Sequence, residues 1–445
     1  MKRISCILIL GALTMSACNE PNAVKSGMDY AVFESALDSV VGLVYQETSA
    51  VPPDAETVAD SSSEILANQP GLAIMVQQQG VPLLKKGYGL MALSDGVAAH
   101  ATPSMAVEAL AEDAWDQAIT EATNFRMASV SKQFTAMAAY ILIDQGKLTF
   151  DTLLGDLFND LSPAAQAVTV GQLMNHTSGL LDYEDLIPRD RVEQVSDADV
   201  LEMIRPLDST YFEPGTQFRY SNTGFCLLTL VVEQVSGVEY REFMQREIFR
   251  PLEMEHAYMH RAGSDMPGRA FGYRPLKPET EGDPWKFRFA DQSITSATRG
   301  DGSVYISAND YQTWTNALIG SSSFPSGQYL TDLAAQRMPV KDGVDYSLGW
   351  FVVPIVKGDV GADGIEEAVE NAIGYHLSHS GETTGFRNIV YHNTATGLSI
   401  SIFANRDDTR ISAVFEGIME ILEAAHPVAE LPDSPELFFW MSSVY

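Results

Sequence analysis

Strand-like segments occur near both ends of the chain, and a long helical block separates them. Apolar runs at 71–76 and 81–93, joined by a short turn, predict a hairpin. Three more apolar runs follow near the other end, at 348–356, 386–392 and 398–404. Because strands and helices do not alternate, the pattern favours an antiparallel sheet. We therefore expect an α+β fold, in which helices flank one antiparallel sheet built from distant parts of the chain.

Apolar residues at helical spacing predict the remaining elements. Residues 28–45 and 411–425 each predict one helix, and Arg126 to Gln145 predict a third. Residues 302–318 begin as a short strand and continue as a helix, and residues 150–290 read as mostly helical with proline breaks. The middle of the chain is thus an inserted helical subdomain.

These patterns divide the chain into six segments. In chain order they are a signal peptide (1–17), a lipidated tether (18–27), the first part of an α/β subdomain (28–135), a mainly helical subdomain (136–295), the second part of the α/β subdomain (296–430) and a C-terminal tail (431–445). We expect the functional site to lie between the α/β and the helical subdomains.

The N-terminus has the features of an export signal. Two basic residues precede an apolar run at 4–17, which is shorter than the roughly 20 residues that span a bilayer. Cys18 follows Met-Ser-Ala, which resembles a bacterial lipoprotein cleavage box. We expect Cys18 to carry lipid and to anchor the protein on the periplasmic side of a membrane. Ordinary cleavage near Ala17 is the alternative.

The charge balance narrows the classes of partner. The chain has 28 basic and 59 acidic residues, a net charge of −31, which argues against a nucleic-acid partner. A hydrophobic content of 45% is enough for a sizeable core. Much of the acid gathers at 47–66, 93–122 and 359–370, which we interpret as solvated insertions.

The sequence predicts neither a metal nor a cofactor. His256 and His260 have i, i+4 spacing, but a third ligand is not evident, and a glycine-rich phosphate loop is also lacking. Cys226 lies in an apolar run, which favours a buried small hydrophobe over a nucleophile.

The chemistry begins with an S-x-x-K motif. Ser129 and Lys132 stand at the predicted start of a helix, where a spacing of three residues places both side chains on one face. A serine needs an adjacent base to become a nucleophile, and a lysine can serve when burial lowers its pKa. Backbone N–H groups at the helix start would face a developing anion. The motif alone is common by chance.

Two later motifs add to it. Tyr220 and Asn222 form Y-x-N, in which the tyrosine can share proton transfer with Lys132 and the amide can bind a substrate carbonyl. His379 and Gly381 form H-x-G, and the missing side chain of the glycine would let a substrate lie along a strand edge.

The order of the three motifs resembles the serine β-lactamase and penicillin-binding-protein superfamily. Residues 173–180, 214–222, 300–302 and 307–310 make the chain similar to the class C β-lactamase-related serine hydrolases, which include carboxypeptidases, D-aminopeptidases and esterases. The similarity runs from about residue 28 to 425. It implies a β-lactamase/transpeptidase-like fold.

The resemblance also implies a role for each motif residue. Ser129 would be the acylated nucleophile, and Lys132 and Tyr220 would activate it, with either one as the principal base. The backbone N–H groups of Ser129 and Glu382 would form the oxyanion hole. His176 would be structural. The implied substrate-binding residues are Asn222, His379, Ser380, Gly381 and Glu382.

His379 departs from the class C β-lactamases, which usually have lysine at this position. A histidine has an unperturbed pKa of about 6.5 and is mostly neutral at pH 7, so efficient β-lactamase activity is not expected. The sequence predicts that turnover of carboxylate substrates improves below about pH 6.5. Arg299 and Arg387 are alternative carboxylate partners, or else structural residues.

The sequence as a whole predicts a serine hydrolase that acts through an acyl-enzyme on amide or ester substrates, such as the D-amino-acid peptides of the cell wall. The alternatives are a broad-specificity carboxylesterase, a weak β-lactamase, or a penicillin-binding sensor that deacylates slowly.

Overall fold

The computed structural model describes only part of the chain. The described residues are 30–45, 66–94, 116–261, 266, 268–280, 285–319, 324, 327–341, 343–355, 372–408 and 410–425. The predicted signal peptide, the tether with Cys18 and the tail at 431–445 lie outside these residues, as do all of 359–370 and most of 47–66.

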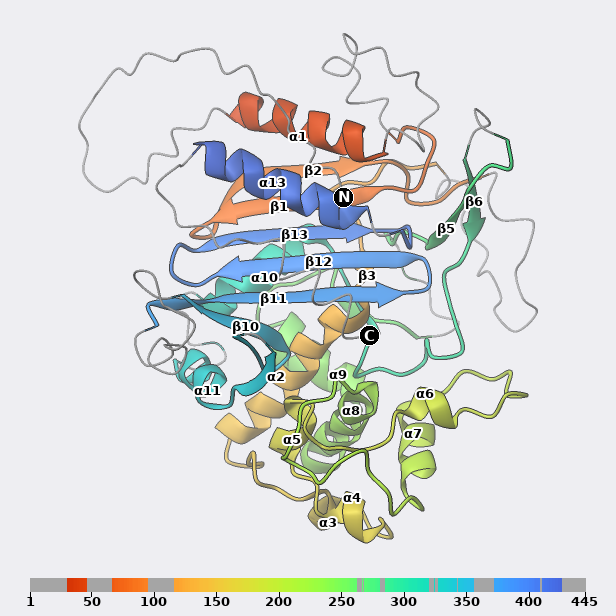
Figure 1. The fold of residues 1–445 in the computed structure, drawn as a ribbon, viewed down its shortest axis with the longest axis vertical. Coiled ribbons are helices and arrows are strands. Elements are labelled where there is room, and N and C mark those ends of the chain that lie inside the picture. The colour runs from red at the N-terminus through yellow and green to blue at the C-terminus, as the bar shows by residue number, and fades with distance from the viewer. Residues whose placement is uncertain are drawn as a thin grey trace.

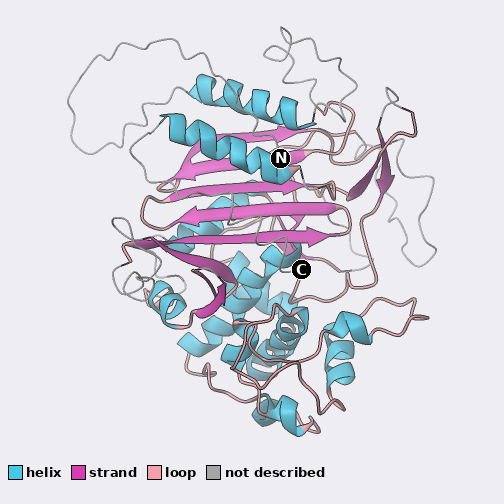
Figure 2. Ribbon diagram, in the orientation of Figure 1, coloured by secondary structure: helices cyan, strands magenta, loops and turns pink. Residues whose placement is uncertain are grey.

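One antiparallel sheet dominates the described part (Figures 1 and 2). Its strand order is β2-β1-β13-β12-β11-β10-β9-β8. The strands are β1 Leu72–Gln78, β2 Val81–Tyr88, β8 Met338–Lys341, β9 Val344–Ser347, β10 Trp350–Ile355, β11 Gly374–Thr383, β12 Phe386–Asn393 and β13 Leu398–Ala404. The β1–β2 hairpin pairs with β13, with Leu72 opposite Ala404. The prediction of one antiparallel sheet built from distant sequence is therefore confirmed.

Helices cover both faces of this sheet, which explains why the inner strands β1, β12 and β13 are almost wholly buried. Helices α1 (Tyr30–Tyr45) and α13 (Ile411–Ala425) contact each other on one face (Figure 1). They pack on alternate residues of β1 such as Ile74, while its neighbour Met75 faces the opposite core. Helix α10 (Ala308–Ile319) contacts β1 and β13 from that second side.

The helical region lies against the second face. Helix α2 (Ser131–Asp144) runs through its centre, is buried from Ser131 to Leu142, and packs on α8. The Phe134 ring stacks on Trp314 of α10 at a centroid distance of 4.3 Å. The other helices are α3 Leu154–Leu157, α4 Pro163–Gln166, α5 Val170–Met174, α6 Tyr183–Leu186, α7 Asp197–Ile204, α8 Asn222–Ser236, α9 Tyr240–Met244 and α11 Tyr329–Ala335.

The chain around Ser129 forms several short elements where the sequence predicts one continuous helix. Instead of a helix from Arg126, the structure has strand β3 (Phe125–Arg126) and a 3₁₀ turn over Ala128–Val130, which we call the serine turn. Helix α2 begins only after it, and the predicted limit at 135/136 falls inside α2. Strand β3 forms because it pairs with β7 (Val304–Ile306), a distant partner that local periodicity does not reveal.

Short strands also interrupt the predicted helical subdomain. Strand β4 (Tyr258–Met259) joins β7 and β3 in a three-stranded sheet, and β5 (Tyr273–Leu276) pairs with β6 (Lys286–Phe289). These short strands lie in and beside the proline-rich region that the sequence predicts as a break in the helical block, and they form by pairing with partners that local periodicity does not reveal. Within the described residues, every helix is too short or too polar to cross a membrane.

Candidate active site

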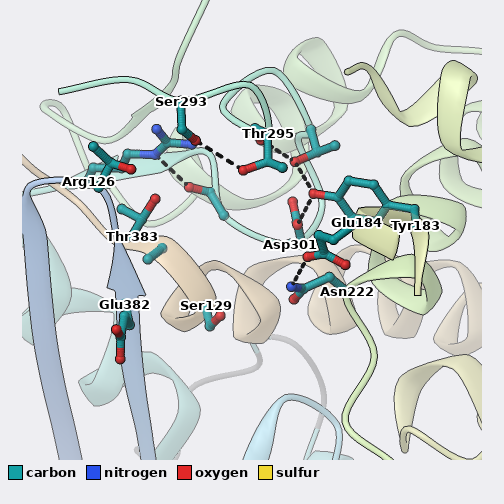
Figure 3. A pocket seen from close by; sticks show the side chains of 14 residues that line it. Arg126, Ser129, Tyr183, Glu184, Asn222, Ser293, Thr295, Asp301, Glu382 and Thr383 are labelled. Carbon is teal, nitrogen blue, oxygen red and sulfur yellow. Dashed lines mark hydrogen bonds between the residues drawn. The ribbon is translucent and has the colours of Figure 1, made fainter. Parts of the chain in front are cut away.

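A cavity of about 240 Å³ opens beside the serine turn, between the end of β11 and helices α6 and α8 (Figure 3). Polar side chains dominate its wall. The lining residues are Arg126, Ala128, Ser129, Tyr183, Glu184, Asn222, Ser293, Thr295, Thr298, Asp301, Gly302, Glu382, Thr383 and Thr384. Ser129, Asn222 and Glu382, three of the residues predicted from sequence, thus share one cavity.

Ser129 stands in the middle of the serine turn with 7% of its surface exposed. The turn is tied to the small sheet, because Met127 N–H donates to Val304 O over 2.8 Å. Ala128 has φ +48°, a left-handed conformation that costs a non-glycine residue about 1–2 kcal/mol. A strained, anchored backbone of this kind is frequent at functional sites.

Lys132 lies one turn behind the serine and is fully buried. Its Nζ donates to Ser129 Oγ over 3.1 Å, to Asn222 Oδ1 over 2.7 Å and to the Asp301 carbonyl oxygen over 3.1 Å. Burial lowers the pKa of Lys132 to about 8, because the charged ammonium loses its hydration. A substantial neutral fraction near pH 8 is what a general base requires.

Tyr220 is not among the residues that line the cavity, but its ring centroid lies 4.8 Å from Lys132 Nζ. The ring packs on His176 at a centroid distance of 4.2 Å. Ser221 N–H donates to His176 Nδ1 over 3.0 Å, so the buried histidine holds the Y-x-N segment in place. This contact gives His176 a structural role.

Asn222 is the first residue of α8 and already has two partners. Besides accepting from Lys132, its Nδ2 donates to Glu184 Oε1 over 2.6 Å. A hydrogen-bonded chain therefore runs from Ser129 through Lys132 and Asn222 to Glu184. Desolvation raises the pKa of the Glu184 carboxyl, although part of the side chain is open to solvent.

Glu184 and Asp301 are the residues that sequence reasoning missed. Glu184 lies on the short helix α6, where it carries no motif of its own. Asp301 was visible only as the middle residue of the Gly-Asp-Gly stretch at 300–302, to which no chemistry was attached. Both line the cavity.

The H-x-G segment lies on β11, which pairs with β10 only as far as Ser378 and continues beside β12 to Thr383. Gly381 approaches the serine turn so closely that a Cβ there would overlap the Met127 carbonyl oxygen. The glycine therefore makes room for the backbone that leads into the serine turn. That its missing side chain also accommodates substrate stays a prediction.

His379 does not behave as the sequence predicts. It is 0% exposed and is not among the residues that line the cavity. Its Nδ1–H donates to Ser380 O over 2.6 Å, and its Nε2 accepts from the Tyr346 hydroxyl over 3.3 Å. Burial, with the nearby Lys132, lowers its pKa to about 3. This burial argues against the prediction that His379 gains charge near pH 6.5.

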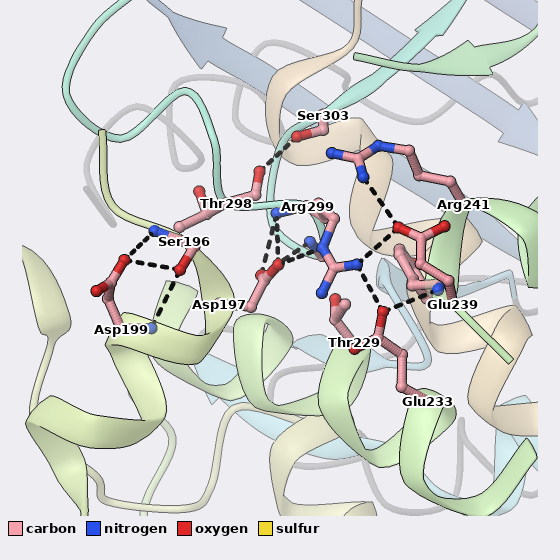
Figure 4. A network of polar contacts seen from close by, with 12 residues as sticks. Ser196, Asp197, Asp199, Thr229, Glu233, Glu239, Arg241, Thr298, Arg299 and Ser303 are labelled. Atoms are coloured by element: carbon pink, nitrogen blue, oxygen red, sulfur yellow. Dashed lines mark hydrogen bonds and ion pairs between the residues drawn. The ribbon is translucent and has the colours of Figure 1, made fainter. Parts of the chain in front are cut away.

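The arginines near the site have partners within the protein. Arg126 donates to Gly302 O and to Ser296, and Arg387 pairs with Glu382 at 2.5 Å. Arg299 pairs with Asp197, Glu233 and Glu239 (Figure 4).

The Arg299 network has a structural role close to the site. Both the backbone N–H and the Nε of Arg299 donate to the buried Asp197 carboxylate, at 3.0 and 2.7 Å for the closest oxygens. These bonds hold the start of the 300–302 segment, whose Asp301 carbonyl binds Lys132.

His256 and His260, whose spacing suggested metal ligands, do not belong to a metal-binding cluster among the described residues. In the described ranges, His, Cys, Asp and Glu side chains do not gather in threes in a way that could hold a metal ion. Cys226 is buried on α8, where desolvation raises the pKa of its thiol, so its predicted role as a small core residue agrees with its position.

An antiparallel sheet against a helical region, with a serine–lysine pair at their junction, defines the β-lactamase/transpeptidase-like class. The family model described as Beta-lactamase matches residues 62–418. The chain belongs to this family of serine hydrolases, so the resemblance inferred from the three motifs is confirmed at family level.

Curated relatives match over a limited part of their length. Penicillin-binding protein 4* of Bacillus subtilis (strain 168) is 29% identical over 238 residues, which are 51% of this chain and 52% of the relative. Protein flp of Staphylococcus aureus (strain MW2) is 25% identical over 210 residues, 46% of this chain and 38% of the relative. The chain thus spans about half or less of these relatives.

Solved structures share the fold. A penicillin-binding protein from Bacillus halodurans has a TM-score of 0.59 at 24% identity, covering 79% of this chain and 94% of that one. D-amino acid amidase from Ochrobactrum anthropi SV3 has a TM-score of 0.61 at 17% identity, covering 88% of this chain and 98% of that one. A β-lactamase/D-alanine carboxypeptidase from Pseudomonas syringae has a TM-score of 0.61 at 18% identity, covering 86% of this chain and 99% of that one. The predicted fold class is therefore confirmed.

Proposed function

We propose that the protein hydrolyses amides or esters through an acyl-enzyme on Ser129. The observation that carries this proposal is the 3.1 Å contact between Lys132 Nζ and Ser129 Oγ, together with the burial that brings the pKa of Lys132 to about 8. A weakly basic, dehydrated amine next to a hydroxyl is the arrangement that activates a serine.

In the proposed acylation, neutral Lys132 accepts the Ser129 hydroxyl proton as Oγ bonds to the substrate carbonyl carbon. The carbonyl oxygen becomes an oxyanion, and we assign its stabilisation to the backbone N–H groups of Ser129 and Glu382. The bond to the leaving amine or alcohol then breaks, and that group takes the proton from Lys132, with Tyr220 as the alternative donor. In deacylation, the same base takes a proton from water as the water oxygen bonds to the ester carbonyl carbon. The bond to Ser129 Oγ then breaks, Oγ takes that proton, and the acid is released.

The substrates that we propose are derivatives of D-amino acids, including cell-wall peptides. Two structural neighbours, the D-amino acid amidase and the β-lactamase/D-alanine carboxypeptidase, support this class. The cavity of about 240 Å³ suits a small acyl group, since sites for larger ligands usually exceed about 300 Å³.

Weak β-lactamase activity, broad esterase activity and slow deacylation are the competing proposals. A penicillin or a C-terminal peptide carries a carboxylate, which needs a cation. The Arg126, Arg299 and Arg387 guanidinium groups all have partners inside the protein, and burial favours neutral His379. Within the proposed class, these observations favour D-amino acid amides and esters over cell-wall peptides that carry a carboxylate near the scissile bond.

The deciding experiment labels the purified protein with a fluorophosphonate and with a fluorescent penicillin. Ser129→Ala should lose all label. Ser131→Ala is the matched control, because its Oγ accepts from Val304 N–H inside the fold, and it should keep the label. If neither probe labels Ser129, the nucleophile assignment fails. A penicillin label that persists for hours would favour the sensor. Nitrocefin, p-nitrophenyl esters and D-Ala-D-Ala peptides then rank the substrates.

We also propose that the protein is a lipoprotein anchored through Cys18 on the periplasmic side of a bacterial membrane. The basic start, the apolar run and the cysteine support this proposal. Cys18→Ala should move the protein from the membrane fraction to the soluble periplasm. An unchanged membrane fraction would contradict a lipid anchor at this cysteine.

A further inference from the structure

We propose that Asp301 and Glu184 form a subsite for an ammonium group of the substrate, so that the enzyme selects acyl groups with a free amine. The inference rests on the proposed acyl-enzyme chemistry and narrows its substrate class. Both carboxylates lie on the same side of the cavity as Asn222 (Figure 3). Tyr183, the neighbour of Glu184 in sequence, donates its hydroxyl proton to Asp301 Oδ2 over 3.3 Å.

The Asp301 carboxylate is the main observation. Its residue is 8% exposed, yet Oδ1 has no hydrogen-bond partner in the described part of the chain. Lys132 donates to the backbone carbonyl of Asp301, and no ion pair joins the two side chains among the described residues. A buried carboxylate oxygen without a donor is costly, and such a group in a cavity calls for an explanation. An ammonium group brings three N–H donors and a compensating charge.

No ion pair neutralises these two carboxylates among the described residues. Glu382 pairs with Arg387, and Arg126 donates to Gly302 O and Ser296 instead of to Asp301 or Glu184. Asp301 and Glu184 therefore form a wall of the cavity whose carboxylates lack an ion-pair partner within the described part of the chain. A cationic ligand fits that wall, while an acylated amine would leave the Asp301 oxygen without a charged donor.

The position of the subsite places the amine near the scissile bond. Glu184 Oε1 accepts from Asn222, and Asn222 in turn accepts from Lys132, the neighbour of the nucleophile. Because Ser129 and the two carboxylates line one cavity, we assign the amine to the acyl part of the substrate, with the α-carbon as its position. The class of substrate is therefore an α-amino acid amide or ester with a free amino group.

The competing explanation makes Asp301 a counter-charge for Lys132 alone. In that case its removal would change the reactivity of Ser129 toward every substrate equally. A subsite instead predicts an effect that depends on the substrate amine. The ratio of kcat/KM for a free-amine substrate to that for its N-acetylated form separates the two roles.

The test uses alanine methyl ester and N-acetylalanine methyl ester, each as both enantiomers, on the wild type, Asp301→Asn and Glu184→Gln. The wild type should prefer a free amine by at least tenfold. Asp301→Asn should lower this ratio by about 10–100-fold, the range for one charge-assisted hydrogen bond, mainly through KM. Asp182→Asn is the matched control, because it removes a carboxylate that pairs with Arg219 and does not line the cavity, and it should leave the ratio unchanged.

Labelling of Ser129 by a fluorophosphonate separates failure of the subsite from failure of the proposed function. Without labelling, the acyl-enzyme proposal itself fails. If Ser129 is labelled, alaninamide should slow the labelling of the wild type by the fluorophosphonate, and N-acetylalaninamide should not. Equal slowing, a wild-type ratio near one, or an equal loss for both esters in Asp301→Asn would each overturn the ammonium subsite.

Discussion

Lys132 Nζ lies closer to Asn222 Oδ1, at 2.7 Å, than to Ser129 Oγ, at 3.1 Å. The asparagine amide therefore orients the lysine, and its own Nδ2 is held by Glu184. Asn222 thus helps to position the amine beside the serine, while burial lowers the pKa of that amine.

The first prediction concerns the pH dependence of acylation. Since burial brings the pKa of Lys132 to about 8, the neutral base disappears below that pH. The kcat/KM for a neutral ester should rise with pH, level off above about 8, and fall about tenfold per unit at lower pH. Lys132→Met should lose about 10²–10⁴-fold in kcat/KM. A flat profile between pH 6 and 9 would exclude Lys132 as the base.

The second prediction tests the Asn222–Lys132 contact. Asn222→Asp places a carboxylate beside the amine, and an opposite charge at this distance favours the ammonium form. The inflection of the pH–rate profile should move above 8. Asn222→Leu, the control, should lower kcat/KM without moving the inflection of the pH–rate profile upward. If Asn222→Asp keeps the wild-type inflection, the amine that titrates is not the one that Asn222 contacts.

The third prediction reverses what the sequence alone indicates about His379. Its pKa is lowered to about 3, chiefly by burial, so it stays neutral throughout the working pH range. The pH–rate profiles for carboxylate substrates and for neutral esters should run parallel between pH 5 and 8. A selective gain for carboxylate substrates below pH 6.5 would show that His379 protonates after all.

The fourth prediction concerns acid stability. Burial lowers the pKa of His260 and His376 to about 4 and that of His379 and His392 to about 3. Between about pH 6.5 and 3, the unfolded chain binds protons that the folded chain does not, so stability falls as pH falls. Each histidine adds a slope of up to about 1.4 kcal/mol per pH unit.

Urea unfolding between pH 7 and 5 measures this slope. The raised pKa of Asp197, to about 6 through burial, acts in the opposite sense, because its protonation favours the folded state. His392→Gln should reduce the loss of stability on acidification, and replacement of the exposed His256 by glutamine should not. Identical slopes for the two variants would contradict the role of buried histidines.

The fifth prediction tests the approach of β11 to the serine turn. In Gly381→Ala the new methyl group meets the Met127 carbonyl oxygen, and overpacking of this kind costs about 1–3 kcal/mol. The variant should be less stable to urea and should also lose kcat/KM, because the two segments must move apart. Gly327→Ala, where a Cβ meets nothing within 4 Å, should change stability by less than about 0.5 kcal/mol. Equal stability of the two variants would argue against the contact.

The sequence by itself determined the elements that depend on local pattern. Helix α1, the β1–β2 hairpin and the β12–β13 pair occur where periodicity and turn residues predict them. Side-chain identity and order also sufficed for the three motifs, and thereby for the family. These features are readable because a helix, a hairpin or a serine–lysine pair is specified within a few neighbouring residues.

Only the tertiary structure decided how the motif residues behave. It brings Glu184 and Asp301 from separate segments to Lys132, sets Met127 against Gly381, and buries His379 until it cannot gain a proton near neutral pH. Desolvation and proximity are properties of the assembled chain, and no pattern along the sequence encodes the distance between residues a hundred positions apart. The motifs identify the residues of the proposed chemistry, and the packing around these residues sets their pKa values and the charge that we propose the site prefers.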